Sequence, residues 1–179
     1  MKKQFLLNLF VLFFFANFLQ AQTLINPIIK GFGAIGDAPE ATEKPDPNMD
    51  YKIIVDLMTG EEDKSELSFS LNNVARLINL HAMGGVPKEK ITVVVAIHGS
   101  AIWSAMNNET HKKAFGVENP NTPLFKELIN SGVKILVCSQ SMFKRKIAAD
   151  ELVPDLEVAT SALTVISTYQ LKGYAIIRF

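Results

Sequence analysis

From Tyr51 onward, the apolar residues follow two alternating patterns, one typical of strands and one typical of helices. Short continuous apolar runs rich in β-branched residues are typical of strands buried on both faces, because a half-buried strand is apolar only at every second position. Five such runs predict strands, the fourth of them the weakest. They cover residues 51–57, 91–97, 133–138, 156–158 and 174–178.

Between these runs, apolar residues recur at the three- and four-residue spacing of a buried helix face. Gly84 and Gly173 follow two of these segments, as glycine often follows a helix. Thr122 with Pro123 predicts an N-cap followed by proline at the first helical position. The predicted helices cover residues 68–83, 101–114, 122–132, 140–147 and 160–171.

The alternation of strands with helices predicts the fold class. Parallel strands need crossover connections, and a helix that packs on the sheet is the usual crossover. Residues 51–179 are therefore predicted to form one α/β domain, with three layers (α/β/α) around a mostly parallel five-stranded sheet.

The first residues have a different pattern. Two lysines precede an apolar run over residues 5–19, and the small residue Ala21 ends the segment. This order is typical of a secretory signal peptide, so residues 1–21 are predicted to be cleaved off after Ala21 and the protein to be periplasmic or secreted. The alternative is an uncleaved membrane anchor, for which the run is short, since a span takes about 20 residues. We expect no stable membrane insertion.

Residues 22–50 form an arm before the domain. Its four prolines and three glycines argue against long helices or strands. Ile25, Ile28, Ile29 and Phe32 make it too apolar for a free tail. We expect the arm to lie across the domain or against a neighbouring subunit.

The glycines of the arm match a known motif. Gly31, Gly33 and Gly36 have the spacing G-x-G-x-x-G of dinucleotide-binding proteins. That motif requires a strand before the glycines and a helix after them, and neither is predicted here. Dinucleotide binding is therefore not expected, and no cofactor is predicted.

Composition excludes several function classes. Of 179 residues, 18 are Lys or Arg and 18 are Asp or Glu, so no basic excess indicates nucleic-acid binding. The single cysteine, Cys138, rules out an intrachain disulfide. His81, predicted to pack, and His111, predicted on a polar helix surface, lie far from His98 and Cys138 in the chain, without metal-ligand spacing. No metal site is predicted.

A binding site is expected beyond the carboxyl ends of the strands, where open α/β sheets bind ligands. Asp56 lies near the end of the first predicted strand, His98 and Gly99 follow the second, and Cys138 ends the third. Cys138 precedes a predicted helix start, whose N–H groups and dipole favour a thiolate. The alternative is an unreactive buried thiol. His98 is either an acid–base group beside the thiol or a hydrogen-bonded residue that closes the turn.

Several of these segments together resemble one family. They are the strand that ends in Ile97-His98-Gly99, then Asn119-Pro120-Asn121, Val137-Cys138-Ser139-Gln140, Ser161-Ala162-Leu163-Thr164 and Gly173-Tyr174. Over residues 51–179 the chain resembles the DsrE/DsrF-like family of sulfur-relay proteins, above all its exported branch. The resemblance implies a parallel five-stranded domain that assembles into a homotrimer or homohexamer. It also implies that Cys138 matches the cysteine on which some members carry a persulfide.

Three functions remain open. In the first, Cys138 is the thiol of a sulfur carrier, His98 acts beside it, and unidentified donor and acceptor thiols are the partners. The predicted ligand-binding residues are then Gln140, Ser139, Gly99, Asn121 and Ser161. The alternative is a non-catalytic module that binds a small ligand or serves in assembly. A cysteine hydrolase with Cys138 and His98 as nucleophile and base lacks an evident acidic residue to orient the histidine.

Overall fold

The computed structural model describes residues 23–179, so the predicted signal peptide lies outside the described part. Its centre is a five-stranded sheet with the strand order β4-β3-β2-β1-β5, in which every pairing is parallel. The strands are β1 (Tyr51–Leu57), β2 (Ile91–Ile97), β3 (Lys134–Cys138), β4 (Glu157–Ala159) and β5 (Ala175–Arg178). The predicted sheet is confirmed, and each strand begins within one residue of its predicted start.

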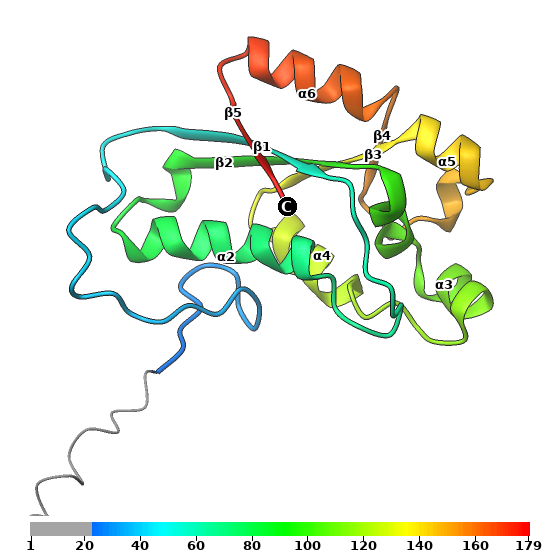
Figure 1. Ribbon diagram of the computed structural model, residues 1–179, viewed down its shortest axis with the longest axis horizontal. Helices are drawn as coiled ribbons and strands as arrows, with labels where there is room; N and C mark the ends of the chain where they lie inside the picture. The colour runs from blue at the N-terminus through cyan, green and yellow to red at the C-terminus, as the bar shows by residue number, and fades with distance from the viewer. Residues whose placement is uncertain (1–22) are drawn as a thin grey trace, which may run out of the picture.

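Helices cover both faces of this sheet, which confirms the three-layer prediction (Figure 1). One face is covered by α2 (Phe69–Met83) and α4 (Thr122–Asn130), and the other by α6 (Ala162–Leu171). In the described part of the chain, the other α-helices are α3 (Asn108–Phe115) and α5 (Ser139–Arg145). Short 3-10 helices form at Lys88–Lys90, Gly99–Ala105 and Ala149–Glu151.

The hydrophobic core is divided unequally between the two faces. The larger cluster lies under α2 and α4, whereas the α6 face holds a smaller one that includes Ile54, Ala96, Leu136 and Cys138. The thiol therefore lies on the thinly covered face of the sheet, where α6 is its main cover.

One predicted helix is wrong. Residues 101–114 do not form a single helix, because the 3-10 helix Gly99–Ala105 ends before Met106, which forms an antiparallel bridge with Leu152. A new helix, α3, then starts after Asn107, whose side-chain oxygen accepts the N–H of Thr110 at 2.8 Å. An asparagine N-cap satisfies amides that the first turn leaves free, and here it restarts the helix.

Two smaller predictions are also corrected. Thr122 is the first residue of α4, with Asn121 at the N-cap position, and the helix ends at Asn130 rather than at residue 132. His111 is not on a polar surface but is 1% exposed. Its Nδ1 lies 2.8 Å from the carbonyl oxygen of Val117, and this hydrogen bond offsets the cost of burying the polar ring.

The arm lies along α2 of its own chain, on the side away from the sheet (Figure 1), as one of the two expected placements. Asn79 of α2 holds it. The Asn79 side-chain oxygen accepts the amides of Ile28 and Ile29 at 3.0 and 2.9 Å, and its amide donates to the carbonyls of Phe32 and Gly33 at 3.0 and 3.1 Å. These backbone groups have no strand or helix partners, so one side chain satisfies them instead.

Gly33, the middle glycine of the motif in the arm, has a structural reason to be glycine. Its φ is +59°, and a Cβ at this position would lie 2.2 Å from the backbone nitrogen of Arg76 in α2. The glycine is thus needed for close approach of the arm to the helix. Within residues 23–50, no strand precedes the glycines and no helix follows them, although the dinucleotide motif requires both.

Among residues 23–179, none of the helices has the length and apolar character needed to cross a membrane.

Candidate functional site

The sulfur of Cys138 lies in a group of hydrogen-bond donors. Cys138 ends β3 and is the N-cap of α5, so the free amides of the first helical turn lie next to it. The donors near its Sγ are the backbone N–H groups of Gln140 and Ser141, the Ser141 hydroxyl, and the backbone N–H of Ala162 at the start of α6, and they act to lower the pKa of the thiol. We call these four donors the thiol nest.

The thiol nest favours the thiolate. Cys138 is 5% exposed, and this burial acts to raise the pKa of its thiol. The hydrogen bonds from Ala162, Ser141 and Gln140 outweigh burial, so the pKa lies below the usual value of a cysteine. Cys138 is therefore activated by neutral donors rather than by a neighbouring cation.

Ser141 connects the thiol to the turn after β2. The N–H of Gly99 donates to Ser141 Oγ at 3.2 Å, which leaves the hydroxyl hydrogen for the sulfur. Gly99 has a φ of +57°, and a Cβ there would lie 2.4 Å from the carbonyl oxygen of Met58, so only glycine fits. Ser141 is not predicted from the sequence pattern, although its position three residues after the N-cap is the one that faces the cap.

Three other predicted ligand-binding residues surround this nest. Ser139 Oγ donates to the carbonyl oxygen of Thr160 at 2.7 Å, and Gln140 Nε2 lies 3.4 Å from the same oxygen. Ser161 is the N-cap of α6 and accepts the N–H of Leu163 at 3.1 Å. These contacts tie the start of α5 to the start of α6 and so place the amide of Ala162 against the sulfur. Ser139 is the first residue of α5.

A buried carboxylate lies on the same face. Asp56 of β1 has a side chain that is 2% exposed, and its Oδ1 lies 2.6 Å from Nε2 of His98. Its Oδ2 accepts a hydrogen bond from Nε of Arg178 of β5 at 2.7 Å and forms an ion pair with Nη2 of the same residue, also at 2.7 Å. Buried carboxylates need such partners because burial alone disfavours the charge. Asp56 is thus the acidic residue that orients His98. The sequence placed Asp56 at this edge of the sheet but did not show this role.

The structure does not bring Asn121 to the thiol. Its Oδ1 accepts the N–H of Ser68 at 2.7 Å, and its amide donates to Asn119 Oδ1 at 3.0 Å. Ser68 is the N-cap of α2, so these bonds join the starts of α2 and α4 on the opposite face of the sheet. Asn121 is placed there to hold two helices together.

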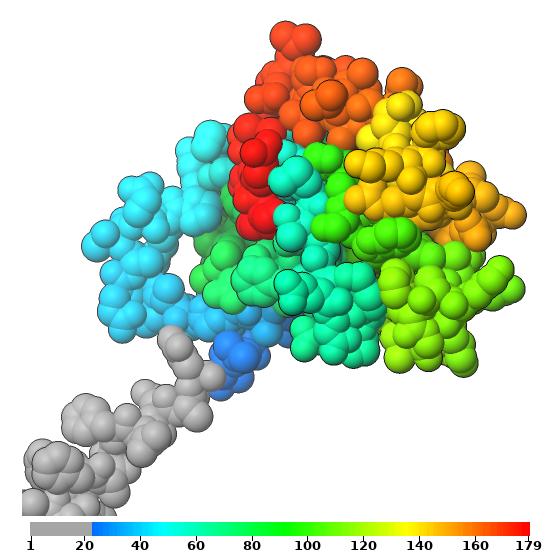
Figure 2. Space-filling model, turned by 45° about the vertical axis from the view of Figure 1, so that its right-hand side comes forward, coloured from blue at the N-terminus to red at the C-terminus, as the bar shows by residue number. Residues whose placement is uncertain are grey.

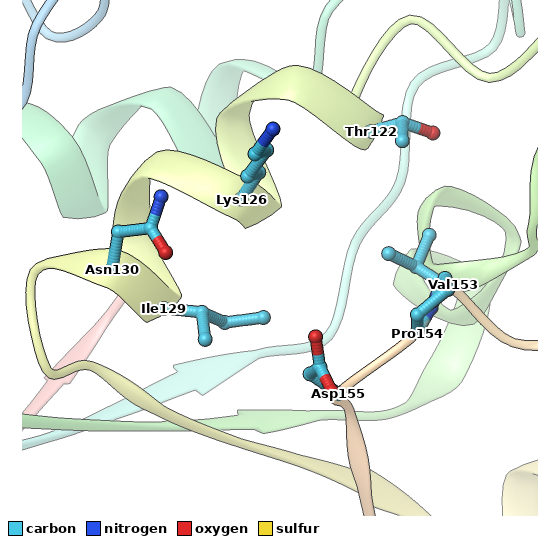
Figure 3. Close-up of a pocket in the computed structure, with 7 residues that line it drawn as sticks. All are labelled: Thr122, Lys126, Ile129, Asn130, Val153, Pro154 and Asp155. Carbon is cyan, nitrogen blue, oxygen red and sulfur yellow. The ribbon is translucent and has the colours of Figure 1, made fainter.

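A separate pocket of about 230 Å³ lies between α4 and residues 153–155. Figure 3 shows the carboxylate of Asp155 pointing toward the apolar side chains of Ile129 and Val153, with Lys126 pointing away from it. None of its lining residues belongs to the thiol nest. Within residues 23–179, no three His, Cys, Asp or Glu side chains are grouped so that they could hold a metal ion.

Fold and site together define a class of protein: an open parallel α/β domain that presents one hydrogen-bonded thiol at the carboxyl edge of its sheet. The family can be stated as well. The model of the DsrE/DsrF-like family matches residues 52–179, so the chain belongs to this family and has a fold of the sulfur-relay type in general.

Solved structures agree on the fold. The protein MTH1491 from Methanobacterium thermoautotrophicum, described as of unknown function, superposes with a TM-score of 0.56 at 19% identity, over 73% of this chain and 100% of the other. The ychN protein from E. coli gives a TM-score of 0.53 at 18% identity, over 72% and 99%. At these identities the likeness concerns the fold alone. Comparison with curated proteins gives no match.

Proposed function

We propose that this protein is a thiol-based sulfur carrier that holds a sulfane sulfur on Cys138 as a persulfide and passes it to an acceptor thiol. The observation that supports this is the thiol nest at the start of α5, whose donors lower the pKa of the Cys138 thiol despite its burial. A cysteine with no chemical role needs no such set of donors, since a buried thiol packs as a small apolar group. Membership of the DsrE/DsrF-like family points to sulfur chemistry independently.

Both half-reactions are displacements at sulfur. The Cys138 thiolate attacks the terminal sulfur of a donor persulfide, a new sulfur–sulfur bond forms, and the donor thiolate leaves. An acceptor thiolate later attacks the same terminal sulfur and releases Cys138. The chain has one cysteine, so the acceptor must come from another molecule or subunit.

Intact mass spectrometry tests this proposal. Purified protein is exposed to inorganic polysulfide, with Cys138→Ser treated in parallel. The proposal expects the mass of one added sulfur on the wild-type protein, removed by reductant and absent from the variant. An unmodified wild-type protein, or equal modification of both, would contradict it.

A non-catalytic assembly module is the second candidate function, and the exposed apolar surface favours it. α6 carries exposed apolar side chains at both ends, with Leu163 79% and Leu171 91% exposed, and Phe143 of α5 is 84% exposed. Figure 2 shows α6 standing above the sheet, with β5 along its open edge. Large exposed apolar side chains on neighbouring helices are a candidate contact surface for another protein.

We propose that this surface joins copies of the chain into the trimer or hexamer expected from the family. Light scattering after size exclusion measures the assembly. Leu163→Asp is expected to give monomers, and Cys138→Ser to leave the assembly intact. If Cys138→Ser also abolishes sulfur uptake, both functions hold together. If the wild-type protein assembles but takes up no sulfur, only the second holds.

We further propose export, with cleavage after Ala21. The basis is the order of two lysines, an apolar run and a small residue over residues 1–21. Expression of the full chain in a bacterial host with an export system, followed by fractionation, is expected to give a periplasmic protein whose first residue is Gln22. A product that keeps Met1 and stays with the membranes would contradict cleavage.

A further inference from the structure

Four side chains follow one another across the sheet in strand order. The register pairs Asp56 with Arg178 between β1 and β5, and Ile97 with Val137 between β2 and β3. One residue further along, His98 follows the end of β2 and Cys138 is the last residue of β3. The two residues therefore lie side by side. The strand order places Cys138, His98, Asp56 and Arg178 on β3, β2, β1 and β5 in turn.

These four residues, which we call the row, lie on the face of the sheet that α6 covers. Ala96 and Leu136 belong, with Cys138, to the cluster under α6, and Asp56 is in register with Ala96. His98 continues β2 with an extended backbone, so its side chain returns to the face of Ala96, two residues earlier. Its hydrogen bond to Asp56 agrees with this placement. Neighbouring strands lie about 4.8 Å apart, so His98 is the nearest ionisable group along the row to the thiol.

Asp56 determines which nitrogen of His98 exchanges protons. The carboxylate takes the Nε2–H bond, at 2.6 Å, so the imidazole keeps its lone pair at Nδ1. Among residues 23–179, Nδ1 of His98 has no hydrogen-bond partner. Arg178 contacts the other carboxylate oxygen through two nitrogens, so both oxygens of Asp56 have charged or hydrogen-bonding partners.

We infer that Asp56 and Arg178 are positioning residues that hold His98 as the proton carrier of sulfur transfer from alkyl persulfides, an inference that rests on the proposed function of Cys138. The Cys138 thiolate attacks the terminal sulfur of R–S–S–H. The bond between the two donor sulfurs breaks, and its electron pair leaves on R–S⁻. His98 takes the proton of the transferred sulfur at Nδ1 and delivers a proton to R–S⁻.

The products are Cys138–S–S⁻ and R–S–H, with the same atoms and one negative charge on each side. The transferred sulfur keeps its oxidation state, so no oxidant or reductant is needed. Asp56 stabilises the imidazolium that forms between the two proton transfers, as a carboxylate does for the histidine of a hydrolytic triad. The thiol nest stabilises sulfur charge, and the row moves the proton.

The dependence of the loading rate on the acidity of the leaving thiol tests this role of His98. Loading rates are measured by quenched mixing and intact mass with two donors of similar size, ethanethiol persulfide and its trifluoro derivative, whose thiol is the stronger acid. A strongly acidic leaving thiol needs little protonation. His98→Gln is expected to slow loading from ethanethiol persulfide by about 100-fold, the lower range for general acid–base catalysis, and loading from the trifluoro donor by far less. Asp56→Asn is expected to act in the same direction, more weakly.

His81→Gln is the matched histidine control and is expected to leave both rates unchanged, because His81 bonds the Leu77 carbonyl on the other face. Arg178→Gln replaces Asp56→Asn if the latter does not fold, since the Arg178 side chain is 67% exposed. Equal slowing of both donors by His98→Gln, or no slowing, would overturn the inference. Wild-type protein that takes up no sulfur from either donor would instead overturn the proposed function.

Discussion

Replacing Ser141 by alanine should raise the pKa of the Cys138 thiol. The Ser141 hydroxyl accepts the Gly99 N–H and donates to Cys138 Sγ, so the substitution removes one of four donors to the sulfur. A hydrogen bond to a charged group contributes about 1.5–3 kcal/mol. The neutral thiol also accepts this bond, but more weakly, so only part of that energy distinguishes the two protonation states.

A difference of about 1.4 kcal/mol corresponds to one pKa unit, so Ser141→Ala should raise the pKa of Cys138 by about one unit. Below the pKa the thiolate fraction then falls about tenfold. A more basic thiolate is also more nucleophilic, with a Brønsted coefficient of about 0.5, which restores about threefold. The net loading rate at fixed pH should therefore fall only about threefold, although the pKa shift itself is large.

The ultraviolet absorbance of the thiolate gives this pKa without a reagent that must reach a buried sulfur. Each protein is titrated against the same protein carrying Cys138→Ala, which removes the contribution of other groups. Ser167→Ala is the control, because the Ser167 hydroxyl bonds the Thr164 carbonyl within α6 rather than the thiol. If Ser141→Ala leaves the pKa in place, or Ser167→Ala raises it equally, the hydroxyl does not stabilise the thiolate.

Three further predictions concern stability. Gly99→Ala should lower the free energy of unfolding in urea by about 1–3 kcal/mol, and by more than Gly85→Ala, because both glycines have positive φ but only Gly99 meets a backbone oxygen. Asn79→Ala should cost about 2–4 kcal/mol, at about 1 kcal/mol for each hydrogen bond to the arm, and should speed proteolysis within residues 23–50; no faster cleavage would show that the arm is held otherwise. Because the folded pKa of Cys138 is lowered, the unfolded chain binds more protons between that pKa and about 8.5. The stability of the wild-type protein relative to Cys138→Ala should therefore rise with pH across this window and be lost as pH falls through the folded pKa, and a flat difference would contradict the sign.

The strands β1, β2 and β3 were predictable because each is buried on both faces. The edge strands β4 and β5 are mostly exposed, and their apolar runs are shorter. The runs at 51–57 and 91–97 coincide with β1 and β2, whose register places both in the middle of the sheet. The helix predicted over 101–114 failed for a local reason, since its apolar spacing continues across the break at Met106. Side-chain capping by Asn107 and the bridge to Leu152 are tertiary features that spacing does not contain.

The site was predictable to the same limited extent. The rule that sites lie beyond the carboxyl ends of strands selects Cys138 and His98 from the sequence, and the structure places them on adjacent strands. The roles of Asp56 and Ser141 depend on which strands are neighbours and on which face each side chain lies. A sequence shows the parity of a residue within its own strand but not the order of the strands, so β1 could not be placed between β2 and β5 beforehand.

Burial of the thiol and the proposed chemistry together restrict the donor. With Cys138 only 5% exposed, a sulfur that approaches it must carry little bulk on the side that enters the nest. The terminal sulfur of a persulfide or polysulfide carries at most a hydrogen, whereas both sulfurs of a disulfide carry a carbon substituent. After transfer, the new sulfur lies about 2 Å beyond Sγ, further from the buried position and nearer to an acceptor. Burial that would make Cys138 unreactive toward bulky reagents is therefore compatible with a carrier of single sulfur atoms, and it selects persulfides over disulfides as donors.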